Sequence, residues 1–248
     1  MMTRIVKILF FLGVALLIVC FVAPSFIDWN KHKAEVMAQI EPYFQRKVTV
    51  AGNISFKGIV ENVLAHENSL KNQRNVAVAQ KIEDKQLYPD KTFTDTWCEK
   101  TGKENICLYY HGTGHTDGDA IIHFEQANIV HMGDLMFNRR HPFVDRSAGA
   151  SMKNWIVALD KASNHFSNDT IFIYGHAGDG YEVTGTKDDL KAFAEYLGQV
   201  LNFVDGEIKA GKTKDEVLKT TTLPFDTQWK GDGLQRPLQA AYEELTAK

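Results

Sequence analysis

The chain has 248 residues, of which 44% are hydrophobic and 24% are charged, enough for one sizeable domain and an appendage. The formal net charge is -3, and no basic run interleaved with aromatic residues occurs, which excludes nucleic acid as an expected partner. The sequence also lacks internal repeats and long low-complexity tracts. Fold and function must therefore be inferred from local patterns along the chain.

An uncharged apolar segment occupies residues 8–27. Its length matches the ~20 residues that a transmembrane helix requires. Arg4 and Lys7 precede it, which predicts a cytoplasmic N-terminus and a single pass through the membrane. The alternative is a cleaved signal peptide, but the apolar core exceeds the usual ~7–15 residues, and Pro24 follows the candidate cleavage position. We expect a retained anchor over residues 1–29, with the lipid bilayer as its partner.

Residues 30–58 predict a helix followed by two short strands. Val36, Ile40 and Phe44 recur at helical spacing. Residues 47–51 alternate between polar and apolar side chains, and a Gly-Asn turn separates them from a second strand. This segment would join the anchor to the main body.

The sequences PSFIDWNKHK and RKVTVAGNISF, with the apolar span before them, resemble the head of AsmA-type proteins. The resemblance covers about residues 1–57. It implies a bacterial inner-membrane anchor, a periplasmic body and an association with envelope assembly. The long β-rich body of that family has no counterpart in this sequence, so only the anchor and the location are carried over.

Two of the three cysteines are spaced for a hairpin. Cys98 and Cys107 flank a segment with Gly102 and Lys103 at its centre, and glycine at the first position suits a type II′ turn. In that register the two cysteines form a non-hydrogen-bonded pair, where the Cα atoms are about 4.5 Å apart, at the short end of disulfide geometry. The pattern predicts a disulfide if the body is periplasmic, and two unrelated thiols otherwise. Cys20 lies in the apolar span.

Four of the nine histidines lie in residues 111–138. The segment begins with a loop rich in Gly, Thr and Asp that carries His115. Two β-branched runs, residues 120–124 and 128–132, then predict a hairpin. Asp134 follows the second run. Because α/β folds place their chemistry where strands open into loops, His115 and Asp134 are expected at one end of a sheet.

The same segment, GTGHTDGDAIIHF followed by NIVHMGDLMFN, resembles the second half of a metallo-β-lactamase-fold hydrolase, and YGHAG at residues 174–178 resembles its late metal-ligand loop. The resemblance covers about residues 59–248 and implies an αββα sandwich that binds one or two zinc ions. His115 matches a ligand of the first zinc, Asp134 the carboxylate that bridges both metals, and His176 a ligand of the second zinc.

The defining His-x-His-x-Asp-His motif of that family is absent. No His-x-His sequence occurs in this chain, and His32 and His66 are the only histidines before residue 111. The resemblance therefore implies an incomplete sandwich without its N-terminal half. Paired metals lie about 3.5–4 Å apart in such sites, so His115 and His176 would serve different ions. Catalysis by this chain alone is not expected.

Strands and helices alternate in the second half of the sequence. A helix is predicted at residues 151–161, followed by a buried strand at residues 170–174. A long helix begins after the cap Thr186 and is stopped by Gly211. A short helix follows the capping box Thr213–Glu216, and a last helix covers about residues 234–246. Together with the hairpins, this order predicts an α/β fold.

The remaining polar candidates have structural explanations as well as functional ones. His123 and His131 lie within predicted strands and are expected to be satisfied by neighbouring groups. His111 is either a support for a ligand or a surface histidine. Asp117 and Asp119 are expected to be turn carboxylates that cap the loop. His141, Asp145 and Arg146 are candidates for the lining of a substrate pocket.

Three functions are compatible with these patterns. The first is a membrane-anchored, single-pass zinc hydrolase relative that is impaired by the missing motif. The second is a non-catalytic AsmA-like envelope scaffold, and the third is a fusion, joined near residue 58, without a selected function. Loss of half of the sandwich would expose apolar surface to water, at a free-energy cost of roughly 25 cal/mol per Å2. This predicts a marginally stable body, or one paired in a homo-oligomer or with a complete homologue.

Overall fold

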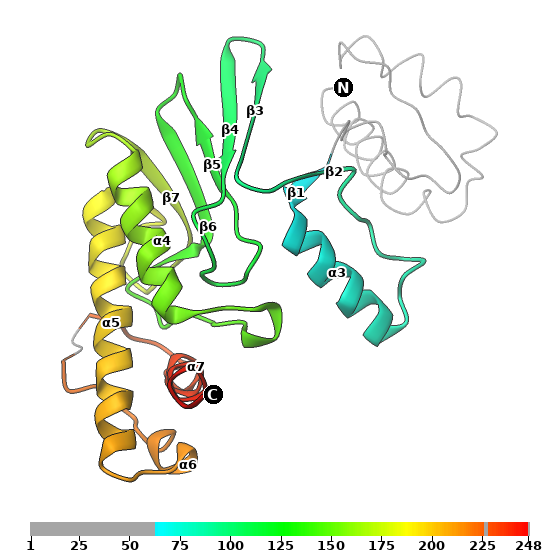
Figure 1. Cartoon of the computed structure of the whole chain (residues 1–248). Helices are drawn as coiled ribbons and strands as arrows, with labels where there is room; N and C mark the ends of the chain where they lie inside the picture. The colour runs from blue at the N-terminus through cyan, green and yellow to red at the C-terminus, as the bar shows by residue number, and fades with distance from the viewer. Residues whose placement is uncertain (1–62, 226–227, 248) are drawn as a thin grey trace, which may run out of the picture. The chain divides into compact units, whose positions relative to one another are not determined.

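The computed structural model describes residues 63–225 and 228–247, and the chain from Leu64 onward forms one compact unit (Figure 1). The predicted membrane span, the predicted elements of residues 30–58, Cys20 and His32 all lie outside the described residues. Within the described ranges, no helix combines the length and the hydrophobicity that a bilayer crossing requires.

The centre of the fold is a six-stranded mixed sheet. In spatial order its strands are β3 (Thr96–Thr101), β4 (Glu104–Tyr109), β5 (Ile121–Phe124), β6 (Ile129–Asn138), β7 (Ile171–Ala177) and β8 (Thr184–Gly185). Neighbouring strands are antiparallel except β6 and β7, which run parallel. The β5–β6 pairing confirms the predicted hairpin. Two short strands, β1 (Leu64–His66) and β2 (Lys91–Phe93), form a separate parallel pair.

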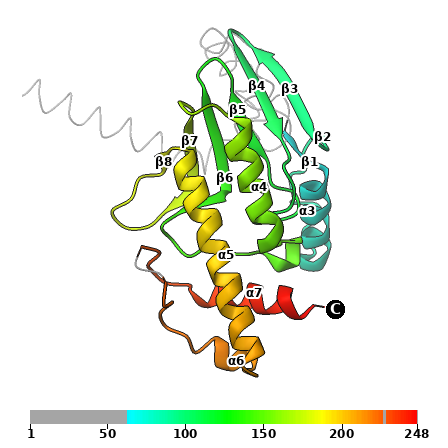
Figure 2. The same ribbon diagram turned by 60° about the vertical axis from the view of Figure 1, so that its left-hand side comes forward.

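Helices cover one face of this sheet. The helices are α3 (Glu67–Gln80), α4 (Met152–His165), α5 (Lys187–Lys209), α6 (Lys214–Val217) and α7 (Gln235–Thr246), with a 3-10 turn at Arg146–Ala148. Helices α4 and α5 lie side by side against the sheet, and α7 packs on α5 (Figures 1 and 2). Helix α3 contacts the β1–β2 pair instead. The described part of the chain is a mixed α/β fold, as expected.

The hydrophobic core lies between the sheet and helices α4 and α5. Val130 and Phe172 are direct partners across β6 and β7, and both are fully buried. Trp155 from α4 and Phe193 from α5 are fully buried against them. One apolar stripe of each helix therefore faces the sheet, since residues three or four apart share one side of a helix.

The opposite face of the sheet is apolar but incompletely covered. Side chains alternate along a strand, so the partners Ile122, His131 and Ile173 point away from α4 and α5. They are only half-buried. Ile171, the partner of Ile129, is 51% exposed.

The predicted helix caps are present. The Thr186 side chain accepts from the first turn of α5, and the Asp189 side chain accepts from the Thr186 backbone in return. Thr213 and Glu216 form the same reciprocal arrangement at α6. Gly211, with φ +83°, follows α5, in the left-handed conformation that glycine adopts most readily after a helix.

Helix α4 is longer than predicted and has a second cap that comes from far along the chain. It continues four residues beyond residue 161, with Ala162 and Ser163 buried. At its start, the Glu244 carboxylate of α7 accepts from the Met152 backbone N–H at 2.7 Å and from the Ser151 hydroxyl at 2.8 Å. A carboxylate at a helix N-terminus also interacts favourably with the helix dipole.

Replacing Glu244 by Gln should lower the free energy of unfolding by about 1–2 kcal/mol, because the amide lacks the charge and one of the two acceptor oxygens. Chemical denaturation monitored by circular dichroism measures the change. Glu243→Gln is the matched control, since Glu243 makes a contact of 3.4 Å to Lys214 at a partly exposed position. Equal effects of the two substitutions would argue against the cap.

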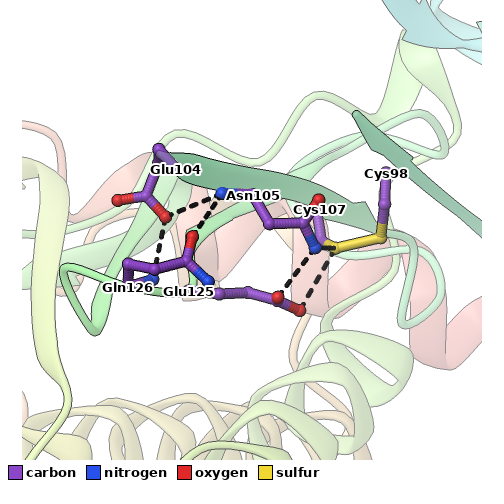
Figure 3. The surroundings of a disulfide bond; sticks show 6 residues. All are labelled: Cys98, Glu104, Asn105, Cys107, Glu125 and Gln126. Atoms are coloured by element: carbon purple, nitrogen blue, oxygen red, sulfur yellow. Dashed lines mark hydrogen bonds between the residues drawn. A yellow bond between two sulfur atoms is a disulfide. The ribbon is translucent and has the colours of Figure 1, made fainter. Parts of the chain in front are cut away.

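The predicted disulfide is present between Cys98 and Cys107, whose Cα atoms are 4.1 Å apart. The two residues are register partners in β3 and β4, and Gly102 in the turn has φ +64°, the positive value that a type II′ turn needs. Asn105 connects this hairpin to the β5–β6 turn, because its side chain donates to Glu125 Oε2 at 2.7 Å (Figure 3).

Removing this bond in the double variant Cys98→Ala/Cys107→Ala should cost about 2–3 kcal/mol of stability, the loss expected for a loop of this length. Urea denaturation with and without reductant measures it. Alkylation followed by mass spectrometry should label one cysteine in the non-reduced chain and three after reduction. Three labelled cysteines before reduction would show that the bond does not form.

Candidate metal centre

The three predicted ligands come together at one end of the sheet. Asp134 belongs to β6, His176 to β7, and His115 to the loop between β4 and β5. Nε2 of His115 lies 3.7 Å from Oδ2 of Asp134, and Nε2 of His176 lies 3.5 Å from Oδ1. The carboxylate therefore lies between two imidazoles, each of which is near a different oxygen. Metal ligation by these residues remains a prediction.

The parallel pairing of β6 and β7 positions two of these side chains. Gly133 pairs with Tyr174 and Phe137 with His176, with an irregularity between them that displaces the chain around Asp134. A Cβ atom at residue 175 would lie 2.3 Å from Oδ1 of Asp134. Glycine at this position leaves the space that the carboxylate occupies.

His115 is held in the tautomer that a metal ligand needs. Its Nδ1 lies 2.9 Å from the backbone oxygen of Phe143. A carbonyl oxygen only accepts, so Nδ1 carries the proton and Nε2 keeps its lone pair. Metal-binding histidines commonly donate their second nitrogen to a carbonyl in this way. The His115 side chain is 14% exposed, which further restricts the ring.

Carboxylates fix the loop that carries His115, as predicted for Asp117 and Asp119. Asp119 accepts from the Thr116 backbone N–H at 3.0 Å and from its hydroxyl at 2.6 Å. Burial raises the pKa of the Asp119 carboxyl, and these hydrogen bonds oppose the shift. Asn72 of α3 donates to Asp117 Oδ1 at 2.8 Å, and Asn68 donates to the Asp117 backbone oxygen at 2.9 Å. Helix α3 thus supports the loop from outside.

The centre is open to solvent on its β7 side. His176 stacks on Phe137 with ring centroids 4.7 Å apart. The His176 and Asp134 side chains are nevertheless 43% and 42% exposed. An ion and a water molecule can therefore reach the carboxylate without a conformational change.

The donor types fit zinc, but their number is small. Two donors at about 2.0–2.2 Å from one tetrahedral zinc ion lie roughly 3.4 Å apart, close to the separations between Asp134 and each imidazole. Because His115 and His176 are near different oxygens, each side of the carboxylate offers two donors. Within the described ranges, no group of three or more His, Cys, Asp or Glu residues is gathered closely enough to hold a metal ion.

The other histidines lie away from the carboxylate or are used structurally. His66 is buried, stacks on Tyr110 and lies 2.8 Å from the Thr94 backbone oxygen through Nε2. His131 accepts from the Gly133 backbone N–H at 3.2 Å through Nδ1, so it is satisfied locally, as predicted. The same prediction is wrong for His123, whose buried Nε2 has no hydrogen-bond partner among the described residues.

The residues predicted as a pocket lining make internal contacts. His141 is buried, with Nδ1 2.7 Å from the Tyr196 hydroxyl. Asp145 accepts from the Ala148 backbone N–H, and Arg146 lies 3.6 Å from Glu244. These contacts order the segment after β6, including the Phe143 carbonyl that orients His115.

Sequence reasoning missed the role of Phe143 at the centre and the position of His165 beside His111. The Phe143 backbone oxygen has no sequence signal, because any residue supplies a carbonyl. His165 in the last turn of α4 lies beside His111, with ring centroids 5.3 Å apart. Burial, followed by the nearby His165 and Lys161 charges, lowers the pKa of His111 to about 4. His111 therefore belongs to a second cluster of histidines and is not a support for His115.

Solved structures of the metallo-β-lactamase fold overlap with part of this chain. A metallo-β-lactamase from Pontibacter korlensis overlaps with a TM-score of 0.45 and 17% identity, over 66% of this chain and 76% of that one. A stereoselective inverting sec-alkylsulfatase from Pseudomonas sp. overlaps with a TM-score of 0.47 and 16% identity, over 64% of this chain but only 27% of that one. No protein-family model and no curated protein sequence matches the chain.

The His111 imidazole should titrate near pH 4 in the folded protein, whereas an unfolded histidine titrates near pH 6.5. Between these values the unfolded state binds more protons, so the stability from the neutral His111 ring is complete above pH 6.5 and is lost as the pH falls toward 4. NMR titration of the His111 ring proton measures the pKa. His111→Phe should reduce the acid sensitivity, and a measured pKa near 6.5 would contradict this assignment.

Proposed function

We propose that the chain is a relative of metallo-β-lactamase-fold hydrolases that binds zinc at Asp134, with His115 as the second ligand on one side of the carboxylate and His176 as the second ligand on the other. One observation carries this proposal: the Asp134 carboxylate lies between two imidazole Nε2 atoms at 3.7 and 3.5 Å. Carboxylate oxygens and neutral imidazoles from separate loops are donors that zinc prefers.

The chain's own residues prepare these donors. The Phe143 carbonyl orients His115, stacking on Phe137 holds the His176 ring, and Gly175 leaves room for the carboxylate. A bound zinc ion would acidify a water molecule toward neutral pH and so supply a nucleophile. The exposed faces of Asp134 and His176 leave space for that water.

Hydrolysis by this chain alone is not part of the proposal. The His-x-His-x-Asp-His motif, which would supply further ligands and orient the attacking water, is absent from the sequence. Two donors on each side of Asp134 form an incomplete ligand set, and an incomplete set binds weakly. A second copy of this chain or a complete homologue could cover the apolar sheet face that includes Ile171 and Ile173.

We also propose a periplasmic location behind a single inner-membrane anchor. The sequence pattern of residues 1–29 and the resemblance to the AsmA head favour this location. The Cys98–Cys107 bond is compatible with it, because disulfides persist in oxidising compartments such as the bacterial periplasm.

The test is zinc binding by the full chain, measured by equilibrium dialysis with metal analysis. His115→Ala, His176→Ala and Asp134→Asn should each lower the zinc affinity of the centre by about tenfold or more. Asp134→Asn should have the largest effect, because that carboxylate serves both sides.

Asp179→Asn is the matched control, since Asp179 is an exposed carboxylate in the loop after β7. It should leave zinc binding unchanged. If zinc binding were the same in Asp134→Asn as in the unaltered chain, the proposal would be wrong. Hydrolysis of a β-lactam or sulfate ester by the chain alone would show instead that the ligand set is sufficient.

A further inference from the structure

A second pair of histidines lies outside the Asp134 centre. His111 lies in the loop after β4, and His165 lies in the last turn of α4. Their ring centroids are 5.3 Å apart, with an angle of 35° between the ring planes. Tyr109 packs beside them, with its ring 4.5 Å from His165. Residues 54 positions apart in sequence are thus brought together only by the docking of α4 against the sheet.

The separation of these rings suits two ligands of one ion. An imidazole nitrogen binds zinc at about 2.0–2.1 Å, and the ring centroid lies roughly 1 Å behind that nitrogen. With tetrahedral geometry, two such rings have centroids roughly 5 Å apart. The observed 5.3 Å requires no large movement of either side chain.

The His111 ring also presents an unused nitrogen. Its Nε2 is buried and has no hydrogen-bond partner among the described residues. Most buried nitrogens in proteins have a hydrogen-bond partner, so a nitrogen without one keeps its lone pair or its proton uncommitted.

Both residues line a surface pocket of about 510 Å3 that is open to solvent. Because Nε2 of His111 is itself buried, the His111 ring must turn toward the pocket for an ion there to reach this nitrogen. Asp160 and Asn164 lie on the same rim and offer oxygen donors, whereas Lys161 brings a positive charge. The Lys161 ammonium donates to the His111 backbone oxygen at 3.2 Å, which holds that charge near the pocket. The charge opposes a cation and should limit the affinity of the site.

We propose that His111 and His165 form a two-imidazole site for a divalent transition metal ion of the copper or zinc type, separate from the Asp134 centre. Imidazole nitrogen suits these ions, and copper(II) binds such sites most tightly among the divalent first-row metals. The low pKa of His111 is compatible with this role, because the ring stays neutral and available at physiological pH.

Copper(II) alone, added to the full chain, is the probe. The His165→Ala variant should lose one equivalent of bound copper, or bind it at least about tenfold more weakly. His165 is exposed at the end of α4, so this variant should fold. In the unaltered chain, pulsed electron paramagnetic resonance should detect two imidazole nitrogens at this ion.

Two further variants sharpen the test. Lys161→Met should tighten copper binding, because it removes the opposing charge. His123→Ala is the control: the buried Nε2 of His123 also has no partner among the described residues, but the ring packs on Phe166 with centroids 5.0 Å apart. The His123→Ala substitution should leave copper binding unchanged.

Asp134→Asn should retain the copper that His165→Ala loses, which separates this site from the Asp134 centre. The proposal is overturned if the chain binds no copper, if His165→Ala binds as much as the unaltered chain, or if His123→Ala causes the same loss as His165→Ala.

Discussion

The parallel pairing of β6 with β7 is the constraint on which the described structure depends. Parallel neighbours need a crossover connection, and α4 provides it by packing Trp155 against the same sheet face as Val130 and Phe172. This packing buries the central core and fixes the register of the two strands. The register in turn brings Asp134 and His176 to one end of the sheet. The stability of the core and the geometry of the candidate centre therefore have the same origin.

The third candidate ligand depends on a different set of forces. His115 lies in a loop whose shape is set by hydrogen bonds, with Asp119 inside the loop and Asn72 of α3 outside it. Its tautomer is set by a carbonyl oxygen 28 residues further along the chain. A loop held by several polar contacts can position a side chain closely while its outer surface remains open to solvent.

The two proposed metal sites share one limitation, since each lacks the three or four protein ligands of a tight zinc site. The Asp134 centre has a carboxylate at its middle and is exposed to solvent. An ion therefore reaches it easily but is bound weakly. The His111–His165 pair has no acid between its rings and has Lys161 nearby. Its affinity would come mainly from the two imidazoles, and copper(II) is the divalent first-row ion that binds such nitrogen donors most tightly.

The sequence by itself determined the local features: both hairpins, the capping boxes of α5 and α6, the Cys98–Cys107 register and the apolar stripes of the helices. These depend on residues close together in the chain, where turn chemistry and side-chain periodicity decide the outcome. Motif resemblance also identified the three residues that meet at the candidate centre. Only the tertiary structure decided the Glu244 cap on α4, the Phe143 contact to His115 and the meeting of His111 with His165. Those contacts join segments separated by tens of residues, and their geometry follows from how α4 and α7 pack, which no local pattern in the sequence specifies.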